Sequence, residues 1–214
     1  MKNTPNKYWN KFYNIENRFN KPSNFAKFIK KKILKKTDMV LDVATGNGRD
    51  AFYFSKYSKT VYGIDKSDVA IRLNKKKTKL ENIKNLKFFN ISSANIKKFK
   101  KKKISLIYAR FFLHAVNERV ENKFLKDLRK YFTKTLKIAL EFRTIKDDLI
   151  KKGKKISKNE RITSHYRRFI DLKDFEKKII KYNFKIIFKR IGQNLSKTTK
   201  ENPHLCRIIL IAND

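Results

Sequence analysis

Short hydrophobic runs alternate with amphipathic segments over most of the chain. The amphipathic segments carry apolar residues at helical spacing, which predicts helices near 49–57, 68–77 and 118–131. The hydrophobic runs have the length of buried parallel strands, and they lie at 39–43, 60–64, 86–90, 104–108 and 136–142. Strand and helix alternating through five strands predict a parallel α/β sheet with helices on both faces.

The two ends of the chain extend this pattern. Aromatic residues at near-helical spacing predict a helix over 7–19, and Pro22-Ser23 opens a second one over 23–34. After a long polar segment at 144–168, a helix at 172–182 precedes two β-rich runs, 184–191 and 205–212. The expected fold is a Rossmann-like, mostly parallel seven-stranded sheet with an antiparallel C-terminal edge strand. Residues 1–37 are expected to form a helical cap and residues 38–214 the main domain.

Charge and composition narrow the possible functions only slightly. The chain has 56 Lys+Arg against 19 Asp+Glu, a net charge of +37, which favours phosphate-rich partners. However, Lys, Asn, Ile and Phe are abundant while Gly (5) and Pro (3) are scarce, as AT-rich codons would produce. One cysteine excludes a disulfide framework, a cysteine-based zinc site and an iron–sulfur cluster. With no membrane-length apolar run and no secretory signal, a soluble cytoplasmic protein is expected.

The turn after the first predicted strand carries the clearest chemical signal. Gly46 and Gly48 allow the backbone to turn sharply and approach a ligand before the next helix begins. Asp65 ends the second strand, where a carboxylate can accept both hydroxyls of a ribose. These features predict a nucleoside cofactor at the carboxyl ends of the strands. The alternative is an ordinary turn in which glycine serves packing alone.

The segment Asp42-Val-Ala44-Thr-Gly46-Asn-Gly48 resembles the first motif of class I S-adenosylmethionine-dependent methyltransferases, with Ala44 in place of their first glycine. The resemblance covers most of the chain and implies S-adenosylmethionine as cofactor. It places Asp65 on the ribose and Ser92 or Ser93 near the adenine, where the family usually has an acidic residue. The cofactor-binding residues that it implies are Asp42, Ala44, Thr45, Gly46, Gly48, Asp65, Lys66, Ser92, Ser93 and Tyr108.

The acceptor side is expected at the ends of the fourth and fifth strands and in the polar segment. In a chain that uses mostly lysine, its arginines stand out, and their planar guanidinium groups match carboxylate and phosphate oxygens. The candidate acceptor-binding or catalytic residues are Arg110, Arg143, Arg167, His114 and His165. Alternatively, Arg110 pairs with Glu141, Arg167 and Arg168 form a solvated face, and the histidines are structural. The histidine spacing does not predict a metal site.

The segments YARFFLHAV, EFRT and HYRRFI also resemble a bacterial subgroup from capsule and surface-glycan gene clusters. That resemblance implies O-methylation of a small anionic acceptor, such as a sugar or a phosphorylated or phosphoramidate-type precursor. A hydroxyl acceptor would need His114 or His165 as base, whereas an ionised oxygen would need only arginines. The alternatives are an RNA methyltransferase and a basic cofactor-binding protein at an anionic membrane. The sequence determines neither the acceptor nor the oligomeric state.

Overall fold

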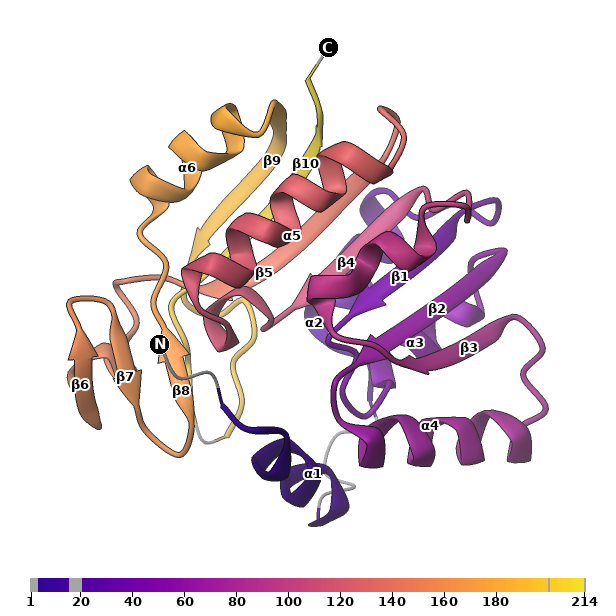
Figure 1. Cartoon of the computed structure of the whole chain (residues 1–214), viewed down its shortest axis with the longest axis horizontal. Helices are drawn as coiled ribbons and strands as arrows, with labels where there is room; N and C mark the ends of the chain where they lie inside the picture. Colours follow the sequence, from indigo (N-terminus) through magenta and orange to yellow (C-terminus); the bar gives the residue numbers. More distant parts are fainter. Residues whose placement is uncertain (1–3, 16–20, 200, 214) are drawn as a thin grey trace.

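The computed structural model describes residues 4–15, 21–199 and 201–213, and these form an α/β fold around one large sheet (Figure 1). The strand order in this seven-stranded sheet is β3-β2-β1-β4-β5-β10-β9. The strands are β1 (Met39–Val43), β2 (Thr60–Asp65), β3 (Leu86–Asn90), β4 (Leu106–Arg110), β5 (Lys137–Arg143), β9 (Phe184–Gly192) and β10 (Leu205–Ala212). The predicted Rossmann-like architecture is therefore confirmed.

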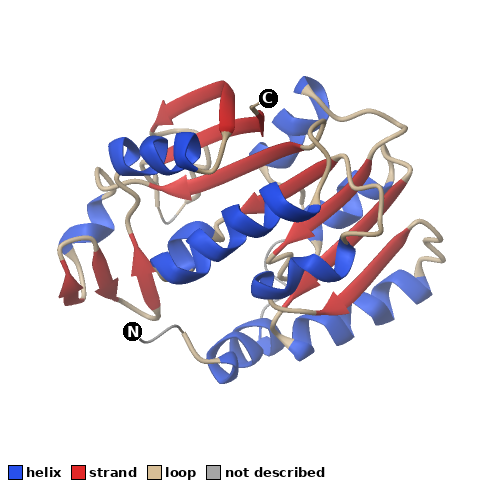
Figure 2. Cartoon of the chain, turned by 45° about the horizontal axis from the view of Figure 1, so that its top comes forward, coloured by secondary structure: helices blue, strands red, loops and turns tan. Residues whose placement is uncertain are grey.

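Helices cover both faces of the sheet, as the amphipathic segments predict (Figure 2). One face packs against α2 (Asn24–Lys32), α3 (Arg49–Ser55) and α4 (Asp68–Leu80). The other packs against the 3-10 helix η1 (Ser93–Phe99), α5 (Glu118–Tyr131) and α6 (Leu172–Lys181). Side-chain caps fix where several helices begin, since Ser67 accepts a hydrogen bond from the Ala70 amide and Asn117 from that of Val120. The apolar stripes of these helices and the doubly covered strands thus form two core layers.

The C-terminal strand departs in one respect from the expected order. β10 is antiparallel to its neighbours, as predicted, but it lies between β5 and β9 and is not the edge strand. The strand at this edge of the sheet is β9, which follows α6 and leaves room for one strand between itself and β5. β10 fills that gap, and its first six residues are buried. Pairing on both sides satisfies the backbone of the most hydrophobic C-terminal run.

The polar segment 144–168, for which the sequence predicts no element, contains regular structure. After a short 3-10 helix, η3 (Asp148–Lys151), it forms a three-stranded antiparallel sheet (the small sheet). Its strands are β6 (Lys154–Ser157), β7 (Glu160–Ile162) and β8 (Tyr166–Arg168). All residues of β6 are exposed, so the segment lacks the hydrophobic alternation by which strands are recognised. Tertiary contacts of β8 with the 3-10 helix η2 (Leu113–Ala115) hold the small sheet against the main one.

The N-terminal segment divides between core and cap. α2 packs Phe25, Ala26 and Ile29 fully buried in the main core. The other helix of this segment, α1 (Asn6–Ile15), lies outside the core, against α4 and beside the small sheet (Figure 1). The predicted helix over 7–19 continues beyond Ile15 into residues 16–20, which lie outside the described residues. Within the described ranges no helix is long and apolar enough to cross a membrane.

Candidate cofactor and acceptor site

The turn between β1 and α3 forms the base of the candidate cofactor site. Ala44, Gly46 and Gly48 all have positive φ, at 58°, 55° and 73°. Gly48 is the N-cap of α3 and gives no side-chain cap to the helix. The backbone therefore turns three times in the left-handed region beyond the strand end. Glycine adopts this conformation without strain, whereas Ala44, in place of the family's first glycine, adopts it at a cost.

Two buried carboxylates hold this turn in place. Asp65 accepts hydrogen bonds from the Gly46 and Ser67 amides, each at 2.9 Å, and Asp42 accepts one from the Thr45 hydroxyl at 2.6 Å. Burial raises the pKa of both carboxyl groups, and for Asp42 the neighbouring Asp50 and Asp65 raise it further. No salt bridge joins either carboxylate to another described residue. The pair therefore fits a ligand with ribose hydroxyls and a positive charge, as S-adenosylmethionine has.

Helix α1 covers the turn through residues whose contacts the sequence did not reveal. A methyl group placed on Gly46 would lie 2.5 Å from the Tyr13 hydroxyl oxygen, so Tyr13 packs directly on this glycine. Burial, followed by Asp65, raises the pKa of Tyr13. Asn10 holds the helix to α4, donating to Asp68 at 2.6 Å and accepting from Ser67 at 2.7 Å. The aromatic run at 8–13 was the only signal of this cover.

The other predicted cofactor residues surround the turn at different places. Lys66 donates through Nζ to the Thr4 carbonyl at 2.6 Å and so ties β2 to the N-terminal segment. Ser92 caps η1 by accepting from the Ala94 amide at 3.3 Å, and Ser93 begins that helix. The Tyr108 hydroxyl donates to Asp50 at 2.7 Å, in the layer under α2. Tyr108 therefore supports the start of α3, and contact of its side chain with the cofactor stays a prediction.

On the acceptor side, two of the predicted arginines form ion pairs. Arg110 donates through Nε to Glu141 at 2.9 Å, as the structural alternative predicted, and Glu141 also binds Arg207 at 2.6 Å. Arg143 donates to Asp147 at 2.8 Å and to Glu201 at 2.6 Å. Glu201 and Arg207 lie far along the chain, so sequence reasoning had no signal for either contact.

A strained phenylalanine lies between these two arginines. Phe111 directly follows β4 and has a φ of 56°, which is unusual for a residue with a large side chain. The guanidinium of Arg110 stacks 3.9 Å from its ring centroid, and that of Arg143 lies 5.7 Å from it. Backbone strain of this kind concentrates at functional sites, so Phe111 joins the candidate acceptor residues.

The arginine pair in the small sheet divides between two faces. Because successive strand residues point to opposite faces, Arg167 and Arg168 do not share a solvated one. Arg168 is buried and donates to Glu121 of α5, anchoring the small sheet. Arg167 faces the site and donates to Thr163 at 3.0 Å. Burial and the charge of Arg143 lower the pKa of Arg167, which indicates that the two cations lie close together.

The two candidate histidines lie near these cations. His114 is buried, and its Nδ1 accepts the Arg143 backbone N–H at 3.2 Å. In the His165 ring, Nδ1 lies 3.0 Å from the hydroxyls of Tyr8 and Ser164. Burial lowers the pKa of both histidines, with Arg143 and Arg167 adding to the effect, and the pKa of His165 falls to about 3. Both rings are therefore neutral at physiological pH.

The His114 contact also determines where its proton is. A backbone N–H only donates, so Nδ1 of His114 must be the unprotonated nitrogen and Nε2 must carry the hydrogen. His114 can thus donate a hydrogen bond to a ligand through Nε2 but cannot remove a proton with it. The described residues contain no cluster of His, Cys, Asp or Glu that could hold a metal ion.

Comparison with known proteins agrees with this geometry. A family model described as a methyltransferase domain matches residues 34–198. No curated protein matches the sequence. An S-adenosylmethionine-dependent methyltransferase from Methanosarcina mazei superposes with a TM-score of 0.74 at 16% identity, covering 86% of this chain and 97% of that one. One from Clostridium acetobutylicum gives 0.70 at 13% identity over 89% and 92%.

The same fold also serves enzymes with different acceptors. An rRNA methylase from Streptococcus thermophilus superposes with a TM-score of 0.57 at 12% identity, covering 88% of this chain and 94% of that one. At such identities the likeness concerns the fold alone and does not select an acceptor. The family match spans most of the chain and includes the turn and both carboxylates. The chain therefore belongs to the methyltransferase-domain family and is an S-adenosylmethionine-dependent methyltransferase.

Proposed function

We propose that this enzyme transfers the methyl group to an oxygen of a small anionic acceptor, bound where β4, β5 and the small sheet meet. The observation that carries the proposal is the grouping of Arg143 and Arg167 around two neutral histidines. Arginine at such a place suits carboxylate or phosphate oxygens. A second supporting feature is Phe111, whose strained backbone places its ring against Arg110.

The histidines favour an acceptor that is already ionised. His114 carries its proton on Nε2, and His165, with a pKa of about 3, is a very weak base at neutral pH. A sugar hydroxyl would need a proton acceptor that neither residue supplies well. A phosphate-type oxygen needs only orientation, because the bound cofactor supplies a methyl group on a positively charged sulfur that is already activated. In this proposal the arginines orient the acceptor and His114 donates to it.

The finer resemblance of the sequence is part of the same proposal. A phosphorylated or phosphoramidate-type precursor of a surface glycan has the charge and size that the arginine group suits. We also propose that residues 1–37 contribute the cap of the site through α1, and that residues 38–214 form the catalytic domain. We further propose that the protein is located in the cytoplasm. This rests on its single cysteine, Cys206, which is buried and forms no disulfide.

Methyl transfer from labelled S-adenosylmethionine to a panel of acceptors tests this proposal. The panel contains sugar phosphates, phosphoramidates, nucleotide sugars, neutral sugars and RNA. Labelling of a phosphorylated small molecule is expected, with loss in Arg143→Lys and little change in Arg161→Lys, an arginine of the small sheet that donates to backbone carbonyls. Labelling confined to neutral sugars or to RNA would contradict the proposal.

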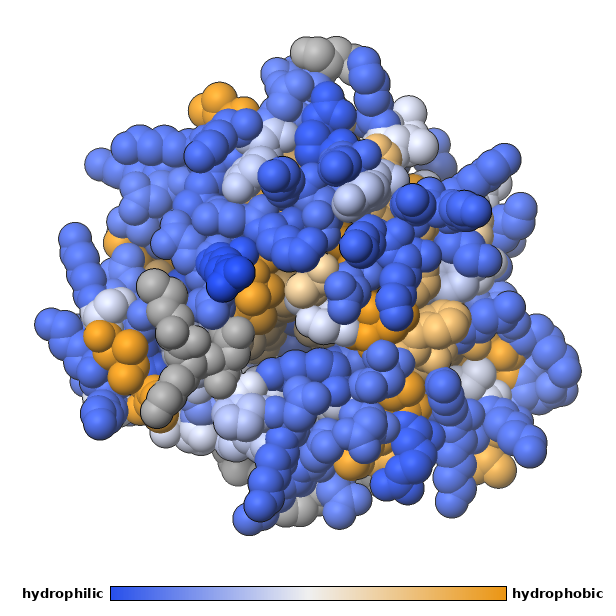
Figure 3. All heavy atoms as spheres, viewed as in Figure 1, coloured by the Kyte–Doolittle hydropathy of each residue, from blue (hydrophilic) through white to orange (hydrophobic). Residues whose placement is uncertain are grey.

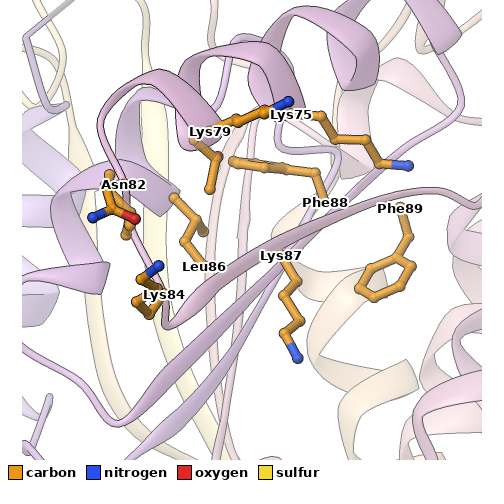
Figure 4. A pocket seen from close by; sticks show the side chains of 10 residues that line it. Lys75, Lys79, Asn82, Lys84, Leu86, Lys87, Phe88 and Phe89 are labelled. Carbon is orange, nitrogen blue, oxygen red and sulfur yellow. The ribbon is translucent and has the colours of Figure 1, made fainter.

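RNA is the second candidate acceptor, and one surface feature favours it. The face of the molecule that Figure 3 shows is mostly hydrophilic. A groove of about 490 Å³ between α4 and the edge strand β3 is lined by the lysines Lys75, Lys79, Lys84 and Lys87 (Figure 4). However, the groove starts at the turn before β3, whereas the cofactor turn lies at the opposite, carboxyl ends of the strands. RNA binding there would show a steep decrease of affinity with salt.

A further inference from the structure

The guanidinium of Arg143 is buried but incompletely bonded. Only 2% of the residue is exposed. Nη1 donates to Asp147 at 2.8 Å and Nη2 to Glu201 at 2.6 Å, while buried Nε has no hydrogen-bond partner among the described residues. A buried donor without an acceptor is costly and rare in folded proteins. At the end of β5, beside the candidate acceptor residues, this donor is available to a ligand atom.

The position of the vacant donor indicates what kind of ligand that is. Nε and Nη2 lie on one edge of the guanidinium plane, the edge that binds two oxygens of one anion in parallel. Glu201 engages only Nη2, so half of this edge is used. We propose that the Nε–Nη2 edge of Arg143 is the receptor for the anionic group of the acceptor, a phosphate or carboxylate, and that Glu201 occupies part of it until the acceptor displaces it.

The charges around Arg143 agree with such an exchange. Arg143 and Arg167 carry two positive charges, opposed by Asp147 and Glu201. When Glu201 leaves, one negative charge remains against two positive charges, and a bound anion restores the balance. The His114 ring, which receives the Arg143 backbone N–H, adds a neutral donor without adding charge.

The side chain of Glu201 can leave Arg143 without disturbing the core, because the backbone of its segment is held in place. The Glu201 amide donates to the Thr198 hydroxyl at 3.1 Å, and the Thr198 amide donates to the Glu201 carbonyl at 2.9 Å. The base of the segment is fixed, because Ser196 donates to Glu141 at 3.0 Å and the His204 amide donates to Asp147 at 3.0 Å. Between these anchors Lys197, Thr198 and Thr199 are exposed, and the Glu201 side chain is 40% exposed although its partner is buried. Glu201 can therefore exchange its bond to Arg143 for water, while Asp147, which is buried, stays.

This inference rests on the proposed function for its acceptor, but it can be tested without one. Inorganic phosphate and, in parallel, acetate are titrated into the full-length protein by calorimetry. In Glu201→Gln, phosphate should bind roughly 5- to 50-fold more tightly than in wild type, because a competing charge-assisted hydrogen bond is lost. The stronger of the two ligands identifies the anionic group. Arg143→Lys, which keeps the charge but has no Nε–Nη2 edge, should lose this binding.

A matched control separates the site from the general basic surface. Glu176 pairs with Lys189 at 2.8 Å, and its side chain is 36% exposed, so Glu176→Gln removes the same charge from a similar environment. Its phosphate affinity should equal that of wild type. NMR of the arginine Nε–H groups in the wild-type protein gives a second readout, in which added phosphate should shift the Arg143 resonance. This measurement does not depend on whether Arg143→Lys folds.

Two results would overturn the inference: equal phosphate affinity in Glu201→Gln and wild type, or equal gains in Glu201→Gln and Glu176→Gln. Failure of the proposed function looks different. If the acceptor panel labels only RNA or neutral sugars while phosphate binding still depends on Glu201 and Arg143, the anion receptor stands and the acceptor assignment fails.

Discussion

Replacing Asp65 with alanine tests the cofactor site at its centre. This buried carboxylate accepts from the Gly46 and Ser67 amides at 2.9 Å each and retains lone pairs for the two ribose hydroxyls. A hydrogen bond to a charged group contributes about 1.5–3 kcal/mol. Loss of two such bonds would weaken binding by about 3–6 kcal/mol, an increase in Kd of about 10²- to 10⁴-fold.

Calorimetric titration with S-adenosylmethionine measures this loss. Asp65→Ala also leaves two buried amides without their acceptor, so circular dichroism must first show that the variant is folded at the titration temperature. Asp127→Ala is the control, since Asp127 is also a buried carboxylate but pairs with Lys123 on α5, which carries none of the cofactor-turn residues. The reasoning fails if folded Asp65→Ala binds within about threefold of wild type, or if Asp127→Ala loses as much affinity.

Three further predictions concern stability, pH and the cover of the site. Glu141→Gln should lower the free energy of unfolding by about 3–5 kcal/mol in urea denaturation, because Arg110 and Arg207 lose a fully buried carboxylate, and a loss below about 1 kcal/mol would contradict this. His165 has a pKa of about 3 in the fold against a usual value near 6.5, so the unfolded chain binds more protons between these values and the fold loses stability as pH falls from 6.5. In thermal unfolding this pH dependence should be shallower in His165→Asn than in wild type by about 1.4 kcal/mol per pH unit, and identical slopes would refute the assignment. Trp9 is the only tryptophan and packs 5.0 Å from His165 and 6.2 Å from Tyr13, between ring centroids. Its fluorescence should therefore change when S-adenosylmethionine binds under α1. An unchanged emission spectrum at saturating cofactor would contradict the position of α1 over the cofactor site.

Much of the fold follows from local sequence because its strands are short hydrophobic runs separated by amphipathic helices. The turn at Gly46 and Gly48 was predictable from local sequence too, since glycine adopts positive φ without strain, but the positive φ of Ala44 was not. The small sheet was not predictable, because its strands are short, β6 is exposed throughout, and β8 is held by contacts distant in sequence. The inner place of β10 was not predictable either, because it depends on pairing with β5, which is distant in the chain.

The sequence by itself determined the cofactor turn, the carboxylates Asp42 and Asp65, and the arginines that gather at the strand ends. These signals are local, because each depends on a residue type next to a strand end. Only the tertiary structure decided what the side chains do there. Pairing with Glu141 engages Arg110, the backbone of Arg143 fixes the proton of His114, and Glu201 covers half of the Arg143 edge. Such contacts join residues up to 58 positions apart, and spacing along the chain carries no information about them.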